Sequence, residues 1–233
     1  MTRLKNIRQA EAHSHVEAYS AHSLYAPGSW LAKPVKTVLE LIPRLRGGEA
    51  FRALDLGCGV GRNAIPVAKE LGGRVDCVDI LPFAIEKLLE NGRNYGVSGS
   101  IRGIVSGIEE FAIEKQTYDL ILAVSALEHT DSEASFLRKL AQIRDGIREG
   151  GAVCLIVNSG VWERDKTTGR ALPPQFEVNL PTAELMDLLE SCFAGWRVEK
   201  RTVVHQKYDI PREMGLAELE TDVLTWVAWR EER

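Results

Sequence analysis

The sequence predicts an α/β fold with a mostly parallel sheet and helices on both of its faces. Five strand-like apolar segments alternate with segments whose apolar residues recur at helical spacing. A turn with glycine at alternate positions joins the first of these strands to the helix after it. Two more strands follow near 196–204 and 222–230, and the second is rich in the β-branched and aromatic residues that suit a strand closing a sheet.

The elements can be assigned in order along the chain. Residues 34–46 repeat apolar side chains at helical spacing, which predicts a helix before the first strand, at 51–56. The helix after the glycine turn ends at the glycine pair 72–73. The same reasoning then predicts strand 74–80, helix 82–94, strand 101–106, strand 118–124, helix 132–147, strand 152–157 and a helix from residue 182.

Two segments have no place in this alternation. Residues 158–181 are polar, broken by proline and glycine and without a clear period, and residues 205–221 are irregular. Both are predicted to lack regular structure. Because long loops in compact domains often act as lids, we expect residues 158–181 and the N-terminal residues 1–33 to cover a site on a single domain, 1–233.

Composition limits the classes of partner. The 233 residues carry a formal net charge of −4 without a dense basic run, which argues against a nucleic-acid partner. No apolar run approaches the roughly 20 residues of a membrane-spanning helix, and the charged N-terminus does not resemble a secretory signal. The four cysteines form no CxxC pair and are interpreted as reduced thiols. We therefore expect a cytoplasmic protein, a monomer or homodimer, that acts on a small molecule and not at a membrane.

The glycine turn predicts a ligand site. Gly57, Gly59 and Gly61 follow the first strand, and Asp55 precedes them. A tight turn needs one glycine or perhaps two, so three indicate a backbone that a ligand approaches closely. In open α/β sheets, ligands bind beyond the carboxyl ends of the strands, which is where this turn lies.

Asp79 and Arg62 restrict the kind of ligand. Asp79 ends the second strand, where a carboxylate can accept hydrogen bonds from both hydroxyls of a ribose; the alternative is a solvated carboxylate or helix cap. A nicotinamide or flavin dinucleotide is a second candidate, but its GxGxxG motif requires glycine where this chain has Arg62. A bulky side chain there opposes the approach of a pyrophosphate.

The segment "LDLGCGVGRNAIPVA", with Asp79 after it and "YDLILAVSALEH" at the fourth strand, resembles the class I S-adenosylmethionine-dependent methyltransferases over about residues 35–160. The resemblance implies a Rossmann-like, doubly wound sheet of seven strands with the last one antiparallel, and S-adenosylmethionine as cofactor. It places Asp55 and the glycine turn beside the methionine moiety, Asp79 on the ribose and Ile80 against the adenine. The cofactor-binding residues expected are Asp55, Gly57, Cys58, Gly59, Gly61, Arg62, Asn63, Asp79, Ile80, Gly107, Ile108 and Ser125.

Within that class, "GCGVGRNA", the "LEH" after strand four, a strand near Trp196 and the ending "LTWVAWREER" look like the tellurite-resistance methyltransferases. Enzymes that methylate thiols and other metabolites share the first two features. The resemblance thus implies a small acceptor, either a chalcogen oxyanion such as tellurite or a thiol. One position departs from the class: many members have an acidic residue after strand three that binds the adenine, where this chain has Ser106 and Gly107. Backbone groups near Gly107 and Ile108, or the side chain of Glu109, are the alternatives.

A sulfonium methyl donor is already activated, so positioning alone can supply roughly 7–11 kcal/mol and a dedicated acid–base pair is optional. The segment 125–129 after strand four is the expected acceptor wall, and His129 is a candidate proton acceptor. The alternative is a histidine that packs at a helix start beside Glu128. Tyr19 and Tyr25 are further catalytic candidates, in an N-terminal segment that would exclude water.

Further features of the sequence bear on the acceptor, on a metal and on catalysis itself. In the 158–181 loop, Trp162 would exclude water, and the cationic side chains Arg164, Lys166 and Arg170 would suit an anionic acceptor. His13, His15 and His22 could suggest a metal cluster, but a His-x-His pair alone in a polar segment lacks a third ligand at convincing spacing, so no metal is expected. A non-catalytic S-adenosylmethionine-binding regulatory module is the alternative to an enzyme.

Overall fold

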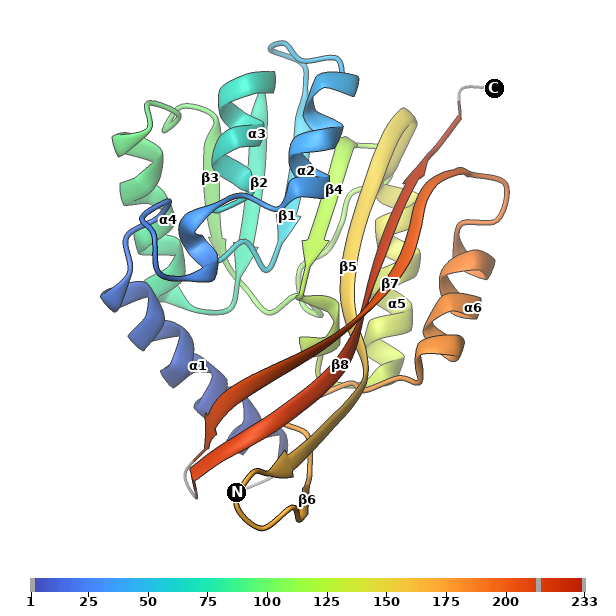
Figure 1. Ribbon diagram of the computed structural model, residues 1–233. Helices are drawn as coiled ribbons and strands as arrows, with labels where there is room; N and C mark the ends of the chain where they lie inside the picture. The colour runs from blue at the N-terminus through green and yellow to red at the C-terminus, as the bar shows by residue number, and fades with distance from the viewer. Residues whose placement is uncertain (1–2, 213–214, 232–233) are drawn as a thin grey trace.

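The computed structural model describes residues 3–212 and 215–231, which form a helix-flanked mixed sheet (Figure 1). The strands follow one another across the sheet in the order β3-β2-β1-β4-β5-β8-β7, and the two-residue β6 pairs with the far end of β5. Their bounds are β1 Arg52–Leu56, β2 Arg74–Asp79, β3 Ile101–Val105, β4 Tyr118–Val124, β5 Ile147–Asp165, β6 Ala171–Leu172, β7 Arg197–Arg212 and β8 Gly215–Trp229.

The parallel part of the sheet reverses its strand order next to β1. From β1 the chain passes through β2 to β3 at one edge, then returns to place β4 on the other side of β1. Both neighbours run parallel to β1, with Asp55 opposite Cys77 of β2 and Leu122 of β4. This is the switch point at which open α/β sheets bind ligands beyond their carboxyl ends.

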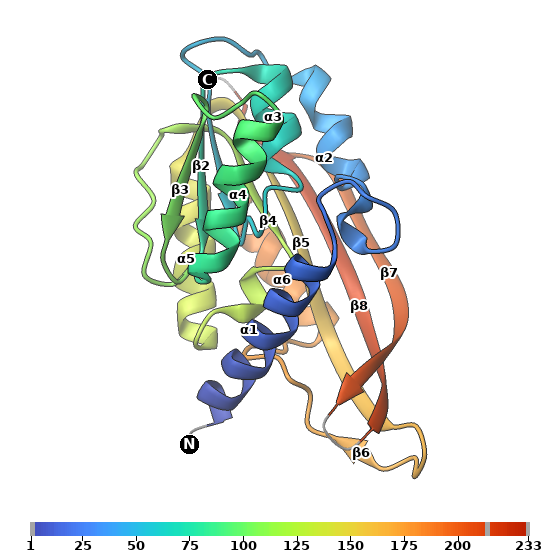
Figure 2. The ribbon, with the colours of Figure 1, turned by 90° about the vertical axis from the view of Figure 1, so that its left-hand side faces the viewer.

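Helices cover both faces of the sheet, as the alternation of elements predicts (Figure 2). Apolar side chains of α2, α3 and α4 pack in one core cluster, and those of α5 and α6 pack in the other. Within the described part of the chain, no helix is both long and apolar enough to cross a membrane. The helices are α1 Arg3–Ala21, α2 Lys36–Leu41, α3 Ala64–Leu71, α4 Pro82–Asn94, α5 Glu133–Gly146 and α6 Thr182–Cys192, with short 3₁₀ turns η1 Trp30–Ala32, η2 Ile42–Arg44 and η3 Leu127–His129.

The last strand runs against its neighbours. β8 is antiparallel to both β5 and β7, so β7 keeps the direction of the parallel strands. The resemblance implied an antiparallel last strand in a seven-stranded, Rossmann-like sheet, and the arrangement of β1–β5, β7 and β8 confirms it.

Of the two segments predicted to be irregular, 158–181 is irregular over 166–170 and 173–181 but begins with a strand, and 205–221 is almost entirely strand. Residues 158–165 continue β5, and residues 205–221, apart from 213–214 which lie outside the described residues, belong to β7 and β8. In β5 the buried side chains alternate at Ser159, Val161 and Glu163, and two of these are polar, which hides the strand pattern in the sequence. The paired strands extend past the carboxyl ends of β1, β2 and β4 (Figure 1). Their backbone groups are satisfied by pairing with one another, so the extension does not need an apolar run.

Candidate functional site

A cavity of about 370 Å³ lies at the carboxyl ends of the parallel strands. This volume is within the range of small-molecule sites, roughly 300–1,000 Å³. Gly57 after β1, Asp79 at the end of β2 and Ser125 after β4 all line it. The cavity therefore occupies the switch point of the sheet.

The glycine turn is shaped by neighbours that leave no space for side chains. Gly57 has φ +70°, and a Cβ built there would lie 2.6 Å from Cβ of Ala126. A Cβ on Gly59, with φ +52°, would lie 2.8 Å from the Tyr19 hydroxyl. Both residues need the left-handed backbone region that glycine adopts without steric cost. The turn thus presents bare backbone beneath the N-terminal segment.

Asp79 ties this turn to the end of β2. Its Oδ2 accepts a hydrogen bond from the backbone N–H of Gly59 at 2.9 Å, and its Oδ1 accepts one from Leu81, also at 2.9 Å. Burial raises the pKa of Asp79, and these two N–H donors oppose the rise. A carboxylate has about four acceptor positions, so both oxygens can still accept hydrogen bonds from a ligand in the cavity.

Asp55 lies deeper, at 1% exposure, and burial raises its pKa to about 7. Nearby Arg62 opposes this rise and Asp79 adds to it. Its Oδ2 is a buried atom without a hydrogen-bond partner in the described structure. A buried carboxylate oxygen without a donor is costly, and a cationic ligand group would relieve that cost.

Helix α1 forms one wall of the cavity. Arg8, Glu11, His15 and Tyr19, all on α1, line it. The Arg8 guanidinium is 2.5 Å from Oε1 of Glu109, across the cavity. Although α1 has 19 residues, it fully buries Ile7 alone and packs the partly buried Tyr19 against the core, so its position depends largely on polar contacts.

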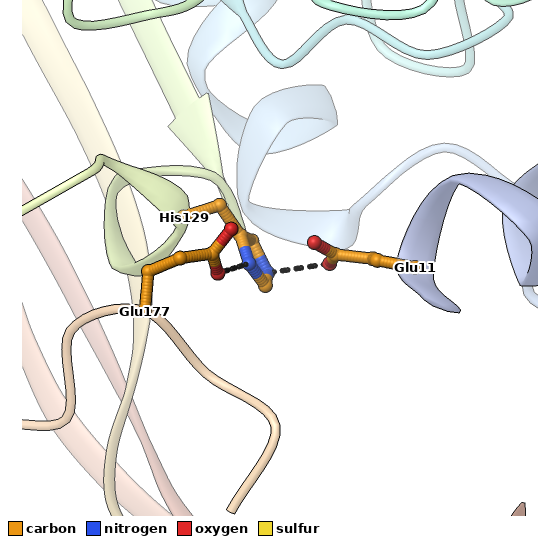
Figure 3. Close-up of side chains that lie close together, drawn as sticks. All are labelled: Glu11, His129 and Glu177. Atoms are coloured by element: carbon orange, nitrogen blue, oxygen red, sulfur yellow. Dashed lines mark hydrogen bonds and ion pairs between the residues drawn. The ribbon is translucent and has the colours of Figure 1, made fainter. Parts of the chain in front are cut away.

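His129 stands between two carboxylates from distant segments (Figure 3). Nδ1 lies 2.9 Å from Oε2 of Glu177, and Nε2 lies 3.0 Å from Oε1 of Glu11. Burial disfavours the charged ring, but the hydrogen bonds to Glu11 and Glu177 outweigh it and raise the pKa of His129 well above its usual range. Both nitrogens face carboxylates, an arrangement that favours the imidazolium form, which donates from each of them.

The same three residues are of the types that bind metal ions, and one ligand atom from each lies within 4.8 Å of the others. Their arrangement, however, does not form a common pocket for an ion. Glu11 and Glu177 contact opposite nitrogens, so the imidazole ring separates the two carboxylates (Figure 3). One histidine offers one nitrogen to one ion, so a shared site requires Glu177 to leave Nδ1. Of His13, His15 and His22 in the N-terminal segment, His15 lines the cavity.

The structure brings many of the predicted site residues together and leaves others outside. Those that line the cavity are Tyr19, Gly57, Asp79, Ile80, Ile108, Ser125 and His129. Those outside its lining are Tyr25, Asp55, Cys58, Gly59, Gly61, Arg62, Asn63 and Gly107.

Several of the residues outside the cavity lining form hydrogen bonds between the glycine-turn region and the N-terminal part of the chain. The Tyr25 hydroxyl donates to the backbone oxygen of Arg62 at 2.8 Å, and its ring packs against Tyr95. Arg62 donates to the backbone oxygen of Trp30, while Oδ1 of Asn63 accepts from the backbone N–H of Val35. Since these groups are used in packing, the structure does not place the Tyr25 hydroxyl near a reacting group.

The cationic side chains of segment 158–181 also lie outside the cavity lining. Arg164 pairs with Glu218 and stacks over Trp162, and Lys166 pairs with Asp209. From that segment the residue that reaches the cavity is Glu177. The wall it forms is acidic, which is the reverse of the charge expected from the sequence.

Sequence reasoning missed Arg8, Glu11 and Glu177. Glu11 belongs to a polar helix without a marked apolar face, and Glu177 to a proline-broken segment. They meet His129 from 118 and 48 positions away along the chain. No local pattern connects such residues, so the sequence held no signal for this cluster.

Comparison with known proteins agrees with this geometry. Residues 53–151 match the methyltransferase domain family. The ubiquinone biosynthesis O-methyltransferase of Methylocella silvestris is 37% identical over 103 residues, which is 44% of this chain and 38% of that enzyme. The chain therefore spans well under half the length of this curated relative.

Two solved structures share the fold over most of the chain. TehB from Haemophilus influenzae has a TM-score of 0.64 at 18% identity, covering 85% of this chain and 62% of TehB. The 1,6-didemethyltoxoflavin-N1-methyltransferase of Burkholderia thailandensis, solved with S-adenosylhomocysteine, has a TM-score of 0.57 at 19% identity, covering 99% and 88%. Residues 53–151 thus carry a methyltransferase domain, and with the glycine turn and Asp79 at the switch point these matches support the class I S-adenosylmethionine-dependent methyltransferase that the sequence resembles.

Proposed function

We propose that this chain transfers the methyl group of S-adenosylmethionine to a hydroxyl group of a small, uncharged molecule. The observation that carries the proposal is that one cavity is lined both by the glycine turn with Asp79 and by His129. The glycine turn and Asp79 suit the cofactor, and His129 suits an acceptor that loses a proton. Methyl transfer to oxygen also agrees with the name of the Methylocella relative.

The residues present fit the cofactor. The turn lacks Cβ atoms where a side chain would obstruct backbone approach, and Asp55 has a buried oxygen without a donor. We assign Asp79 to the ribose hydroxyls, Ile80 and Ile108 to the adenine, and Asp55 with the turn to the amino-acid moiety. When bound, the cofactor supplies a methyl group activated by a sulfonium, which leaves the protein to position the acceptor and remove its proton.

His129 is the proposed proton acceptor. Glu177, whose side chain is 1% exposed, holds Nδ1–H and so directs Nε2 toward the cavity. As the acceptor oxygen gains the methyl group it loses its proton to Nε2, and the imidazolium that forms is stabilised by the Glu177 carboxylate. Tyr19, which lines the same cavity and lies over the turn, is the group we assign to excluding water there.

The charge of the cavity favours an uncharged acceptor over an oxyanion. Glu11, Glu109, Glu177 and Asp79 line it, and Arg8 is the permanently charged cation among its lining residues. Tellurite would be repelled by this wall, because like charges at close range in a partly buried site are costly. A thiol acceptor is also protic and is the second candidate from the sequence resemblance.

A labelled-methyl transfer screen tests the proposal. Phenols and alcohols, thiols, amines, carboxylates, tellurite and selenite are each incubated with the protein and labelled S-adenosylmethionine. We expect transfer to a hydroxyl compound and its loss in His129→Asn, while calorimetric binding of S-adenosylhomocysteine persists in that variant. Transfer to tellurite alone, or full activity in His129→Asn, would contradict the assignment of the acceptor or of the base.

The alternative function, a non-catalytic regulatory module that binds S-adenosylmethionine, predicts a different outcome for binding and for methyl transfer. Such a module binds S-adenosylmethionine but transfers no methyl group to any compound of the screen. Binding without transfer across the whole panel would favour it. Absence of binding to both the cofactor and its demethylated product would remove both functions.

A further inference from the structure

Glu11 occupies the one nitrogen that the proposed reaction needs. Nδ1 of His129 is held by the buried Glu177, and Nε2 is 3.0 Å from Oε1 of Glu11. An acceptor hydroxyl must approach Nε2 to give up its proton. In the arrangement described, the Glu11 carboxylate is where that hydroxyl has to be.

Helix α1 carries Glu11, and its contacts with the rest of the cavity can be broken at little cost. Its described contacts across the cavity are polar: Arg8 pairs with Glu109 at 2.5 Å and lies 3.6 Å from Glu177. Arg3 donates to the backbone oxygens of Pro174 and Phe176. Its apolar contacts are few: Ile7 is buried, and the ring of Tyr19, near the other end of the helix, packs against the core, so the part of α1 that carries Glu11 loses little apolar burial when it moves.

We propose that Glu11 is a positioning residue that closes the acceptor site: its carboxylate holds α1 on His129, and the acceptor hydroxyl replaces it at Nε2 when α1 withdraws. On withdrawal, the Nε2 proton leaves to solvent, and the neutral imidazole is then free to accept the acceptor's proton. The role of Nε2 in this inference rests on the proposed function. The contact between Glu11 and His129 is testable without any acceptor.

The charges around the ring define the pH at which the contact breaks. Arg8 and Glu11 face it from α1, Glu128 adjoins it on η3, and Glu177 faces it from the segment before α6. The pKa of His129 is raised, against the opposing effect of burial, by its hydrogen bonds to Glu11 and Glu177. The ion pair to Glu11 is therefore present below that raised pKa and is lost as the pH rises through it.

The test compares Glu11→Gln with Glu17→Gln, the same change at an exposed site of the same helix. Hydrogen exchange of the α1 amides and the NMR titration of the His129 ring are measured in both. We expect Glu11→Gln to accelerate α1 exchange by roughly tenfold or more, as for loss of a hydrogen bond between charged groups, and to lower the pKa of His129. Glu17→Gln should change neither.

A double-mutant cycle separates this contact from a general weakening of α1. If Glu11 acts through His129, then Glu11→Gln, His129→Asn and the double variant give similar α1 exchange rates. Additive effects, or exchange in Glu11→Gln no faster than in Glu17→Gln, would overturn the inference. Methyl transfer is not measured in this cycle, so a negative result here leaves the proposed function to its own screen.

Discussion

Replacing Asp55 by asparagine should stabilise the fold at neutral and alkaline pH. Burial raises the pKa of Asp55 from 3.8 to about 7, with Arg62 opposing and Asp79 adding to the rise. The folded protein therefore binds a proton that the unfolded chain releases between these two values, and ionising Asp55 costs stability as the pH rises. About three pKa units correspond to roughly 4 kcal/mol. The penalty is absent below pH about 4 and complete above about 7.

Urea unfolding followed by circular dichroism at pH 5 and pH 8 measures this effect. We expect the stability gain of Asp55→Asn over the wild type to be larger at pH 8, while its affinity for S-adenosylhomocysteine falls. Asp76→Asn is the matched contrast, because Asp76 is equally buried but paired with Arg74 at 2.7 Å and Arg52 at 3.2 Å, and its loss should destabilise. A gain for Asp55→Asn that does not grow from pH 5 to pH 8 would refute the assignment of a buried, unpaired carboxylate.

Three further outcomes are expected. Asp79→Ala should weaken S-adenosylhomocysteine binding by roughly 1.5–3 kcal/mol, the range for hydrogen bonds to a charged group, measured by calorimetry; unchanged affinity would remove the ribose assignment. Gly57→Ala combines a left-handed φ of +70° with a Cβ placed 2.6 Å from that of Ala126, so its unfolding free energy should fall by roughly 2–5 kcal/mol in urea. Phe193→Ala removes a side chain that is 1% exposed and packs against Trp226. It should lower the unfolding free energy by roughly 3–5 kcal/mol and leave cofactor affinity unchanged, because Phe193 does not line the cavity.

The sequence was sufficient for the parallel sheet because its signals there are local. The helix predicted at 82–94 and the strand predicted at 118–124 have the observed bounds, since their apolar residues repeat with one period each. The sequence places the glycine turn directly after the first strand, and the observed strand order puts that strand at the switch point. The extended ends of β5, β7 and β8 could not be found in this way, because strands that satisfy their backbone groups by pairing with each other tolerate polar side chains.

The surroundings of the cavity, on both the cofactor and the acceptor side, depart most from the rules by which the core was predicted. Among the described residues, the buried side-chain atoms without a hydrogen-bond partner include oxygens of Asp55, Glu128 and Glu177, and of these the Glu177 oxygen has the Arg8 guanidinium 3.6 Å away. An unpaired buried carboxylate oxygen costs stability, so a sequence selected for folding alone would replace it. Two of these carboxylates flank the reaction path that we propose: Asp55 lies under the cofactor turn and Glu177 lies behind His129. The Asp55→Asn experiment distinguishes the two explanations, because a gain in stability together with a loss of cofactor affinity is what a functional carboxylate predicts, and a gain without that loss is what a merely unfavourable residue predicts.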